Sequence, residues 1–271
     1  MELSSGLFSI AAILVAMVFV AVLEAFAPFR ERGAWSRAHL GPNLALTGIT
    51  FAANLVFNAF LLALLLGVES SGLGLLHLLA VPPLPAAALA VAALDLSFYA
   101  AHVSWHKVPA LWRFHAVHHA DPTLDVTTTI RQHPGESVLR FLTLAAAIVV
   151  IGPSAGAFAF YRVAAALNAL LEHANLRVPA RLDRALALVT TWPSYHKIHH
   201  SRAAAETDSN YANLLSVWDR LFGTYTPPER AAGVVYGLDG MDAAELQTTG
   251  ALLAHPFRGR GRRAARARTL A

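Results

Sequence analysis

Histidine is the residue type through which this sequence could do chemistry. The chain has thirteen histidines, and eight of them form one HxxxH motif and two HxxHH motifs. The motifs consist of His102 and His106, of His115, His118 and His119, and of His196, His199 and His200. Residues three and four positions apart share one face of a helix, so each motif can present its imidazoles in one direction. Eight such ligands are too many for one metal ion but suit two, each held by histidine nitrogens at about 2.0–2.2 Å.

The composition indicates an integral membrane protein. Hydrophobic residues make up 56% of the 271 residues and charged residues 14%, and the mean hydropathy is +0.48. An ordinary soluble domain has roughly 45–50% apolar residues. The chain has no cysteine, which excludes disulfides, thiolate metal sites, Cys-ligated haem and iron–sulfur clusters. The net charge of +4 comes from short loops and a basic end, "RGRGRRAARAR", which favours an anionic membrane surface over nucleic acid as the partner.

Five apolar stretches could enter a membrane: Gly6 to Ala27, Asn43 to Gly67, Leu84 to Val103, Val138 to Ile151 and Ser154 to Leu171. A spanning helix needs about 20 residues. The first stretch meets that length, and we expect it to stay as an anchor because it lacks the basic start of a cleaved signal. The last two are short and separated by Gly152-Pro153, so they allow either one crossing or a hairpin.

Basic residues predict the orientation. Arg30, Arg32 and Arg37 follow the first stretch, and the positive-inside rule places that loop in the cytoplasm. The third stretch then returns the chain to the cytoplasm near His102. If all three motifs serve one site, the last two stretches must cross an even number of times, which favours the hairpin. We therefore expect the site at the cytoplasmic face, and the Ala- and Arg-rich composition favours a bacterial inner (plasma) membrane.

Longer motifs surround the histidines: "DLSFYAAHVSWH", "LWRFHAVHHADPTLDVTTTIRQHPGE", "EHANLRVP", "YHKIHHS" and "DSNYANLLSVWDRLFGTY". From about Leu94 to Phe257 the chain resembles the fatty acid hydroxylase / sterol desaturase superfamily of membrane di-iron oxygenases. One departure is Ala212, where the family usually has glycine after "NY". The resemblance implies two iron ions, activation of O2, and hydroxylation or desaturation of a lipid substrate such as a sterol or fatty acyl chain.

The resemblance also implies which residues bind the irons. Carried over by position, the ligands are the eight histidines of the three motifs together with His173 of "EHAN". His133 of "RQHPGE", with Glu136, matches a further family motif, and it is either a ligand, a loop residue or a substrate contact. His39, His77 and His255 stand alone, and we expect them to be ordinary surface or interface residues.

Three other polar residues are predicted to act at the site. Asp95, Tyr99, His102 and His106 form one helical stripe, and a carboxylate inside a span is costly and usually functional. Asp95 or Tyr99 would orient a ligand histidine or the active-site water, although a structural pairing of Asp95 is the alternative. Asn175 would hydrogen-bond to a ligand histidine or fix a loop, as would Asp208, Asn210 and Asp219.

The sequence thus predicts an all-α integral membrane helical bundle with a cytoplasmic histidine-rich helical cap. We expect N-terminal anchor helices over 1–83, a catalytic domain over 84–226 and a cytoplasmic tail over 227–271. No GxGxxG fingerprint occurs, so electrons would come from an external donor, namely a cytochrome b5-like protein, a ferredoxin or a flavoprotein reductase.

Two other functions are weighed against lipid oxidation. A membrane metal-ion transporter or metal-binding protein could use the same histidines, but they lie at and beyond the end of a span. A hydrolytic zinc site lacks the HExxH motif.

Overall fold

Long helices make up most of the protein. The computed structural model describes residues 2–31 and 33–258, with their side chains except in residues 2–9 and 34–36. The five longest helices are α1 (Glu2–Phe26), α2 (Ala34–Ser71), α4 (Pro83–Lys107), α6 (Pro134–Ile151) and α7 (Ala155–His173). The shorter α-helices are α3 (Leu75–Leu78), α5 (Pro109–His119), α8 (Ala180–Leu186), α9 (Pro193–His199), α10 (Ala204–Thr207), α11 (Val217–Leu221) and α12 (Thr249–Ala254). Four 3₁₀ turns are η1 (Val126–Ile130), η2 (Pro228–Gly233), η3 (Ala244–Gln247) and η4 (His255–Phe257).

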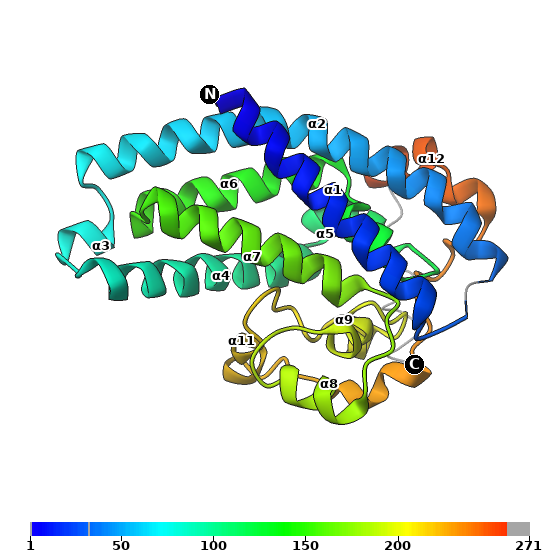
Figure 1. Ribbon diagram of the computed structural model, residues 1–271. Helices are drawn as coiled ribbons and strands as arrows, with labels where there is room; N and C mark the ends of the chain where they lie inside the picture. Colours follow the sequence, from blue (N-terminus) through cyan, green and yellow to red (C-terminus); the bar gives the residue numbers. More distant parts are fainter. Residues whose placement is uncertain (1, 32, 259–271) are drawn as a thin grey trace.

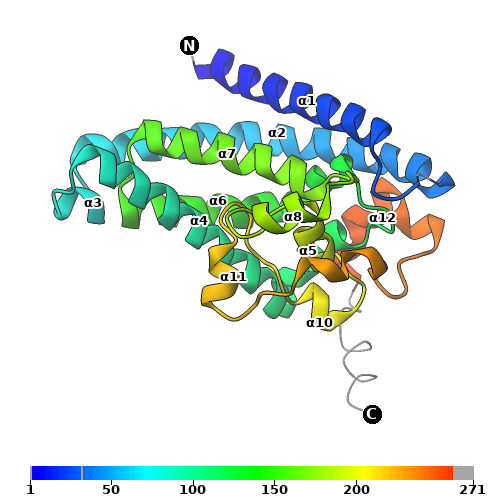
Figure 2. The same ribbon diagram turned by 60° about the horizontal axis from the view of Figure 1, so that its bottom comes forward.

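Helices α2, α4, α6 and α7 lie lengthwise beside one another, and α1 crosses α2 and α7 at an angle (Figures 1 and 2). They share an apolar core that includes Leu61, Leu94, Ile148 and Phe158. Three helical stretches, Arg37–Leu78, Pro83–Lys107 and Pro134–Ile151, are long and apolar enough to cross a membrane. The β-pairing among the described residues is limited to three isolated bridges. The predicted all-α membrane bundle is therefore confirmed.

Helix α2 extends beyond the predicted stretch of Asn43 to Gly67 at both ends and continues through Pro42. Its added first turns carry the buried His39, which lies one turn before the buried Asn43 at the start of the predicted stretch. These polar side chains bond to each other and to Asp121. Hydropathy gave no sign of this extension, because the extension is stabilised by buried polar contacts rather than by apolar ones.

The end of the bundle far from the histidines is closed by two glycines. Helices α6 and α7 are joined by Gly152, Pro153 and Ser154 and form an antiparallel pair, the predicted hairpin. A Cβ added to Gly152 would lie 2.4 Å from the carbonyl oxygen of Leu73, and a Cβ on Gly74 would lie 2.4 Å from the Gly152 Cα. Both glycines have positive φ. Only glycine lets these two backbones approach so closely.

The other end of the bundle carries a cap of short helices, with α8, α9 and α11 lying below α7 in Figure 1. The segment after residue 226 is part of this cap. Ala231, Val234 and Tyr236 pack with Ile198 of α9, and Leu252 of α12 packs with Leu46 of α2. The basic end that the sequence assigns to anionic headgroups falls mostly in 259–271, outside the described residues.

Candidate metal centre

Two groups of buried histidines meet where the bundle joins the cap. His102, His106, His115, His119 and His199 form a five-histidine group, and His118, His173, His196 and His200 form a four-histidine group. Within each group the possible ligand nitrogens all lie within 4.8 Å of one another. The structure thus brings together all nine histidines that the sequence and the resemblance singled out.

Each HxxHH motif is shared between the two groups. In α5 the pair His115 and His119 belongs to the five-histidine group and His118 to the other. At α9 the pair His196 and His200 belongs to the four-histidine group, while His199 turns to the five-histidine group. The two groups are therefore held at a fixed spacing by α5 and α9 together.

The Nε2 atoms point inward. The Nε2 atoms of His102 and His115 are 3.1 Å apart, as are those of His199 and His102. In the four-histidine group the Nε2 atom of His173 lies 3.0 Å from that of His118 and 3.1 Å from that of His196. Two nitrogens at right angles on an ion with bonds of about 2.1 Å would be about 3 Å apart. The donor sets thus fit a metal ion in each group.

The outer nitrogens fix the ring orientations. His102, His199 and His173 use Nδ1–H to donate to the carbonyl oxygens of Tyr211, Ser209 and Ala169, at 2.6, 2.8 and 2.7 Å. The Nδ1 atom of His115 lies 3.1 Å from Glu136 Oε2. A histidine that donates from Nδ1 keeps the Nε2 lone pair free to bind a metal.

The surroundings of four of these histidines favour the neutral ring. Burial, together with the neighbouring imidazoles, holds the pKa of His118, His119 and His200 well below its usual range. Burial likewise lowers the pKa of His199 to about 3. Neutral imidazole is the form that binds metal, so these side chains are ready to bind a metal ion at physiological pH.

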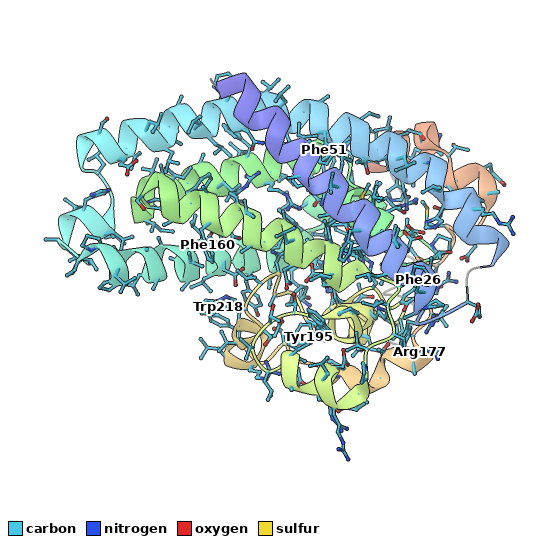
Figure 3. All side chains as sticks on the ribbon, in the orientation of Figure 1. Phe26, Phe51, Phe160, Arg177, Tyr195 and Trp218 are labelled. Atoms are coloured by element: carbon cyan, nitrogen blue, oxygen red, sulfur yellow. The ribbon has the colours of Figure 1, made fainter. Side chains whose placement is uncertain are left out.

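Asp95 and Tyr99 act on the segment 211–224 rather than on a histidine ring. Asp95 Oδ2 accepts from the Leu215 N–H at 2.9 Å and from Trp218 Nε1 at 2.8 Å, and the Tyr99 hydroxyl lies 2.7 Å from Thr224 Oγ1. Figure 3 shows Trp218 in the cap under α4. The segment they hold contains the Tyr211 carbonyl that orients His102. Their link to the ligands is therefore indirect.

Asn175 and His133 lie outside both groups. Asn175 accepts from the Arg30 N–H at 3.0 Å and donates to the Arg30 carbonyl at 2.8 Å, so it fixes a loop, one of the two roles considered for it. His133 is the N-cap of α6: its Nδ1 accepts from the Gly135 N–H, and its Nε2 lies 3.0 Å from the Leu253 carbonyl. Of the three roles considered for His133, this geometry matches the loop role.

The placement predicted for His39 is wrong. Its side chain is 1% exposed, with Nδ1 3.1 Å from Asp121 Oδ2 and Nε2 3.3 Å from Asp125 Oδ2. Asn43 also donates to Asp121. A single histidine in a helix has no spacing pattern that could indicate burial. The two carboxylates that contact it come from residues 121–125, some 80 positions away in the sequence.

A cavity of about 40 Å³ adjoins the histidines. His102, His115, His118, His173 and His196 contribute to its wall. The wall also contains Glu136, Arg140 and Glu172, which reach it from α6 and α7. Arg140 and Glu172 were not predicted as site residues, although Arg140 is a charged side chain in an apolar stretch, the signal that marked Asp95, and Glu172 directly follows the last such stretch.

The sequence profile of the fatty acid hydroxylase family matches residues 87–224, just over half of the chain. The chain belongs to the fatty acid hydroxylase family. The matched span contains all nine histidines, Asp95, Tyr99 and Asn175. It stops at the end of the segment that orients His102.

Curated relatives of this fatty acid hydroxylase family member are lipid-modifying enzymes by name. An ornithine lipid hydroxylase from Rhizobium tropici is 31% identical over 62% of this chain and 49% of its own length. Alkylglycerol monooxygenases from Danio rerio and Homo sapiens are 31% and 30% identical over 55% and 53% of this chain. The aligned region covers 32% and 31% of those two proteins. The chain therefore spans half or less of the length of these relatives. No solved structure matches the chain significantly.

Proposed function

We propose that this protein oxidises a C–H bond of a membrane lipid, by hydroxylation or desaturation, with O2 and two iron ions bound by the nine histidines. The observation that carries the proposal is the pair of buried histidine groups at the end of an apolar helical bundle. Bound iron would supply the redox chemistry that breaks an unactivated C–H bond, which no side chain of the protein can do alone.

Each histidine group would bind one of the two metal ions. Five imidazoles would hold one ion in the first group, and four would hold the other. The four-histidine group offers fewer protein donors. Three of its members, His118, His173 and His196, line the cavity, which is where a substrate would meet the site.

The cavity gives a lipid a route from the bilayer. Its wall includes Phe98 of α4 and Arg140 of α6, which are both half-buried, whereas its histidines are buried. We propose that the cavity opens between α4 and α6, two helices that can span the membrane. A lipid would enter sideways with its apolar chain in the bilayer. The relatives are named for an ornithine lipid and for alkylglycerols, so we propose a polar membrane lipid as the substrate class.

The reaction also needs two electrons and two protons. Hydroxylation combines R–H, O2, two electrons and two protons to give R–OH and water, and desaturation of a CH2–CH2 unit gives the alkene and two waters. We propose an external donor for the electrons, either a cytochrome b5-like protein, a ferredoxin or a flavoprotein reductase. The oxidation site would face the cytoplasm, where these donors occur.

The test uses the iron-loaded protein in detergent with ¹⁸O2 and a chemical reductant. Ornithine lipid and hexadecylglycerol are supplied in turn, and the products are analysed by mass spectrometry. Hydroxylation adds one ¹⁸O to the product, and desaturation removes two hydrogens. Product should be absent in His118→Ala. Product that forms equally without iron would contradict the proposal, and metal uptake into protein-containing liposomes would favour the transporter instead.

A further inference from the structure

We propose that Arg140 holds a neutral carbonyl oxygen of the lipid substrate and so directs oxidation to carbons close to that carbonyl. The inference rests on the proposed function and names a feature of the substrate. Arg140 is the one arginine or lysine among the residues that line the cavity. It lies six residues into α6, about 9 Å along a helix that is long and apolar enough to cross a membrane.

Arg140 has N–H groups that could donate to a ligand. One terminal nitrogen donates to Glu136 Oε1 at 3.0 Å, which uses one of five N–H groups. Its Nε is buried and has no hydrogen-bond acceptor among the described residues. A buried N–H without a partner costs about 1–3 kcal/mol. A ligand oxygen in the adjoining cavity would supply the missing acceptor.

Two aromatic rings in contact with each other lie beside the Arg140 guanidinium. The Arg140 guanidinium carbon lies 5.1 Å from the Phe98 ring centre and 5.4 Å from that of Trp105. The same two rings contact the metal centre: Phe98 is 5.7 Å from the His102 ring centre, and Trp105 is 5.4 Å from that of His115. One side chain therefore separates Arg140 from the histidines. An oxygen bound by Arg140 would have carbons only a few bonds away beside the histidines that line the cavity.

The local charge favours a neutral oxygen over an anion. The Glu136 carboxylate already pairs with Arg140. A carboxylate or phosphate brought to Arg140 would face that carboxylate in a buried site, where like charges repel strongly. An ester or amide carbonyl accepts a hydrogen bond without adding charge, so it fits this position better.

The experiment compares two lipids that differ in one group. Palmitoyl lysophosphatidylcholine has an ester carbonyl, and its hexadecyl ether analogue lacks it. Binding to the zinc-loaded protein is measured by native mass spectrometry, so the result does not depend on iron chemistry or on turnover. We expect the wild type to bind the ester about tenfold more tightly, the contribution of one hydrogen bond from a charged donor.

The variants separate Arg140 from general effects. Arg140→Met should lose the preference while it retains zinc, and Arg140→Lys, which keeps the partner of Glu136, should keep part of it. Arg162→Met is the matched control, because Arg162 is another arginine in the bundle but donates to Asn58 on α2 and does not line the cavity. It should behave as the wild type.

Three results would overturn the inference: no preference in the wild type, a preference that persists in Arg140→Met, or one that is equally lost in Arg162→Met. Palmitate that binds more tightly than the ester through Arg140 would show that the ligand is an anion and would overturn the assignment of a neutral oxygen. Because binding is read without turnover, a failure here is distinct from a failure to find oxidised product.

Discussion

The bonds of each histidine distinguish the two roles that histidine plays in this protein. His118 faces His173 across the four-histidine group at 3.0 Å between Nε2 atoms. His133, fifteen positions later, uses both ring nitrogens on the backbone of Gly135 and Leu253. Motif matching alone left His133 open as a ligand. Its bonds favour a structural role, and the two residues can be separated by experiment.

We expect His133→Ala to keep its bound metal and to lower the free energy of unfolding by about 1 kcal/mol, the usual effect of a lost N-cap. His118→Ala should instead lose metal from the four-histidine group. Elemental analysis and thermal unfolding of both variants in detergent check this. Loss of metal from His133→Ala to the level of His118→Ala would show that His133 is a ligand.

Asp95 is expected to act through the segment it anchors. Asp95→Ala leaves two part-buried donors, the Leu215 N–H and Trp218 Nε1, without their acceptor, at about 0.5–1.5 kcal/mol each. The Tyr211 carbonyl should then hold His102 less firmly, so metal retention should fall. Asp95→Asn keeps one carbonyl oxygen and should retain more metal. Full metal content and stability in Asp95→Ala would contradict this role.

The site residues that could be predicted from the sequence are those in a spaced or family motif, and the single charged residues of the site could not be predicted. The nine histidines were found because they repeat at helical spacing or sit in a family motif. Glu172 and Arg140 line the same cavity, but each is a single charge, and only the fold shows what it faces. His39 was misplaced for the same reason, since its two carboxylate partners are remote in sequence.

At the scale of helices, the sequence predicted the long apolar elements and the hairpin but not how the cap divides the ligands. An HxxHH motif predicts one face of a helix. The structure splits each motif between two groups, because the histidine rings of the two motifs interleave, with those of His119 and His200 stacked at 4.5 Å between ring centres. That arrangement depends on contacts between distant segments, which spacing within one motif does not specify.

The hairpin turn should be sensitive to substitution. Gly152→Ala puts a Cβ against the Leu73 carbonyl and forces alanine into positive φ, so we expect a loss of more than about 2 kcal/mol in stability. Gly156→Ala is the control: it lies in α7 with open space around its Cβ position, and alanine should stabilise the helix by up to about 1 kcal/mol. Equal unfolding temperatures for the two variants would contradict the close approach.

At the scale of the whole molecule, the side of the membrane on which the histidines lie is a prediction from basic loops. The chain has no cysteine, so single cysteines report topology without background. Ser70→Cys, at the exposed end of α2, should react with a membrane-impermeant maleimide in intact cells. Arg184→Cys, exposed on α8 in the cap, should react only after lysis. The reverse pattern would place the metal centre outside the cytoplasm.

The central claim is that nine histidines hold two metal ions, and metal content tests it most directly. The protein is expressed with iron, purified in detergent and analysed for bound metal beside His118→Ala and His102→Ala. We predict about two irons per chain in the wild type and a loss of about one in each variant, since the two histidines belong to different groups. Less than one firmly bound metal in the wild type, or zinc that exchanges freely with solution, would contradict the account.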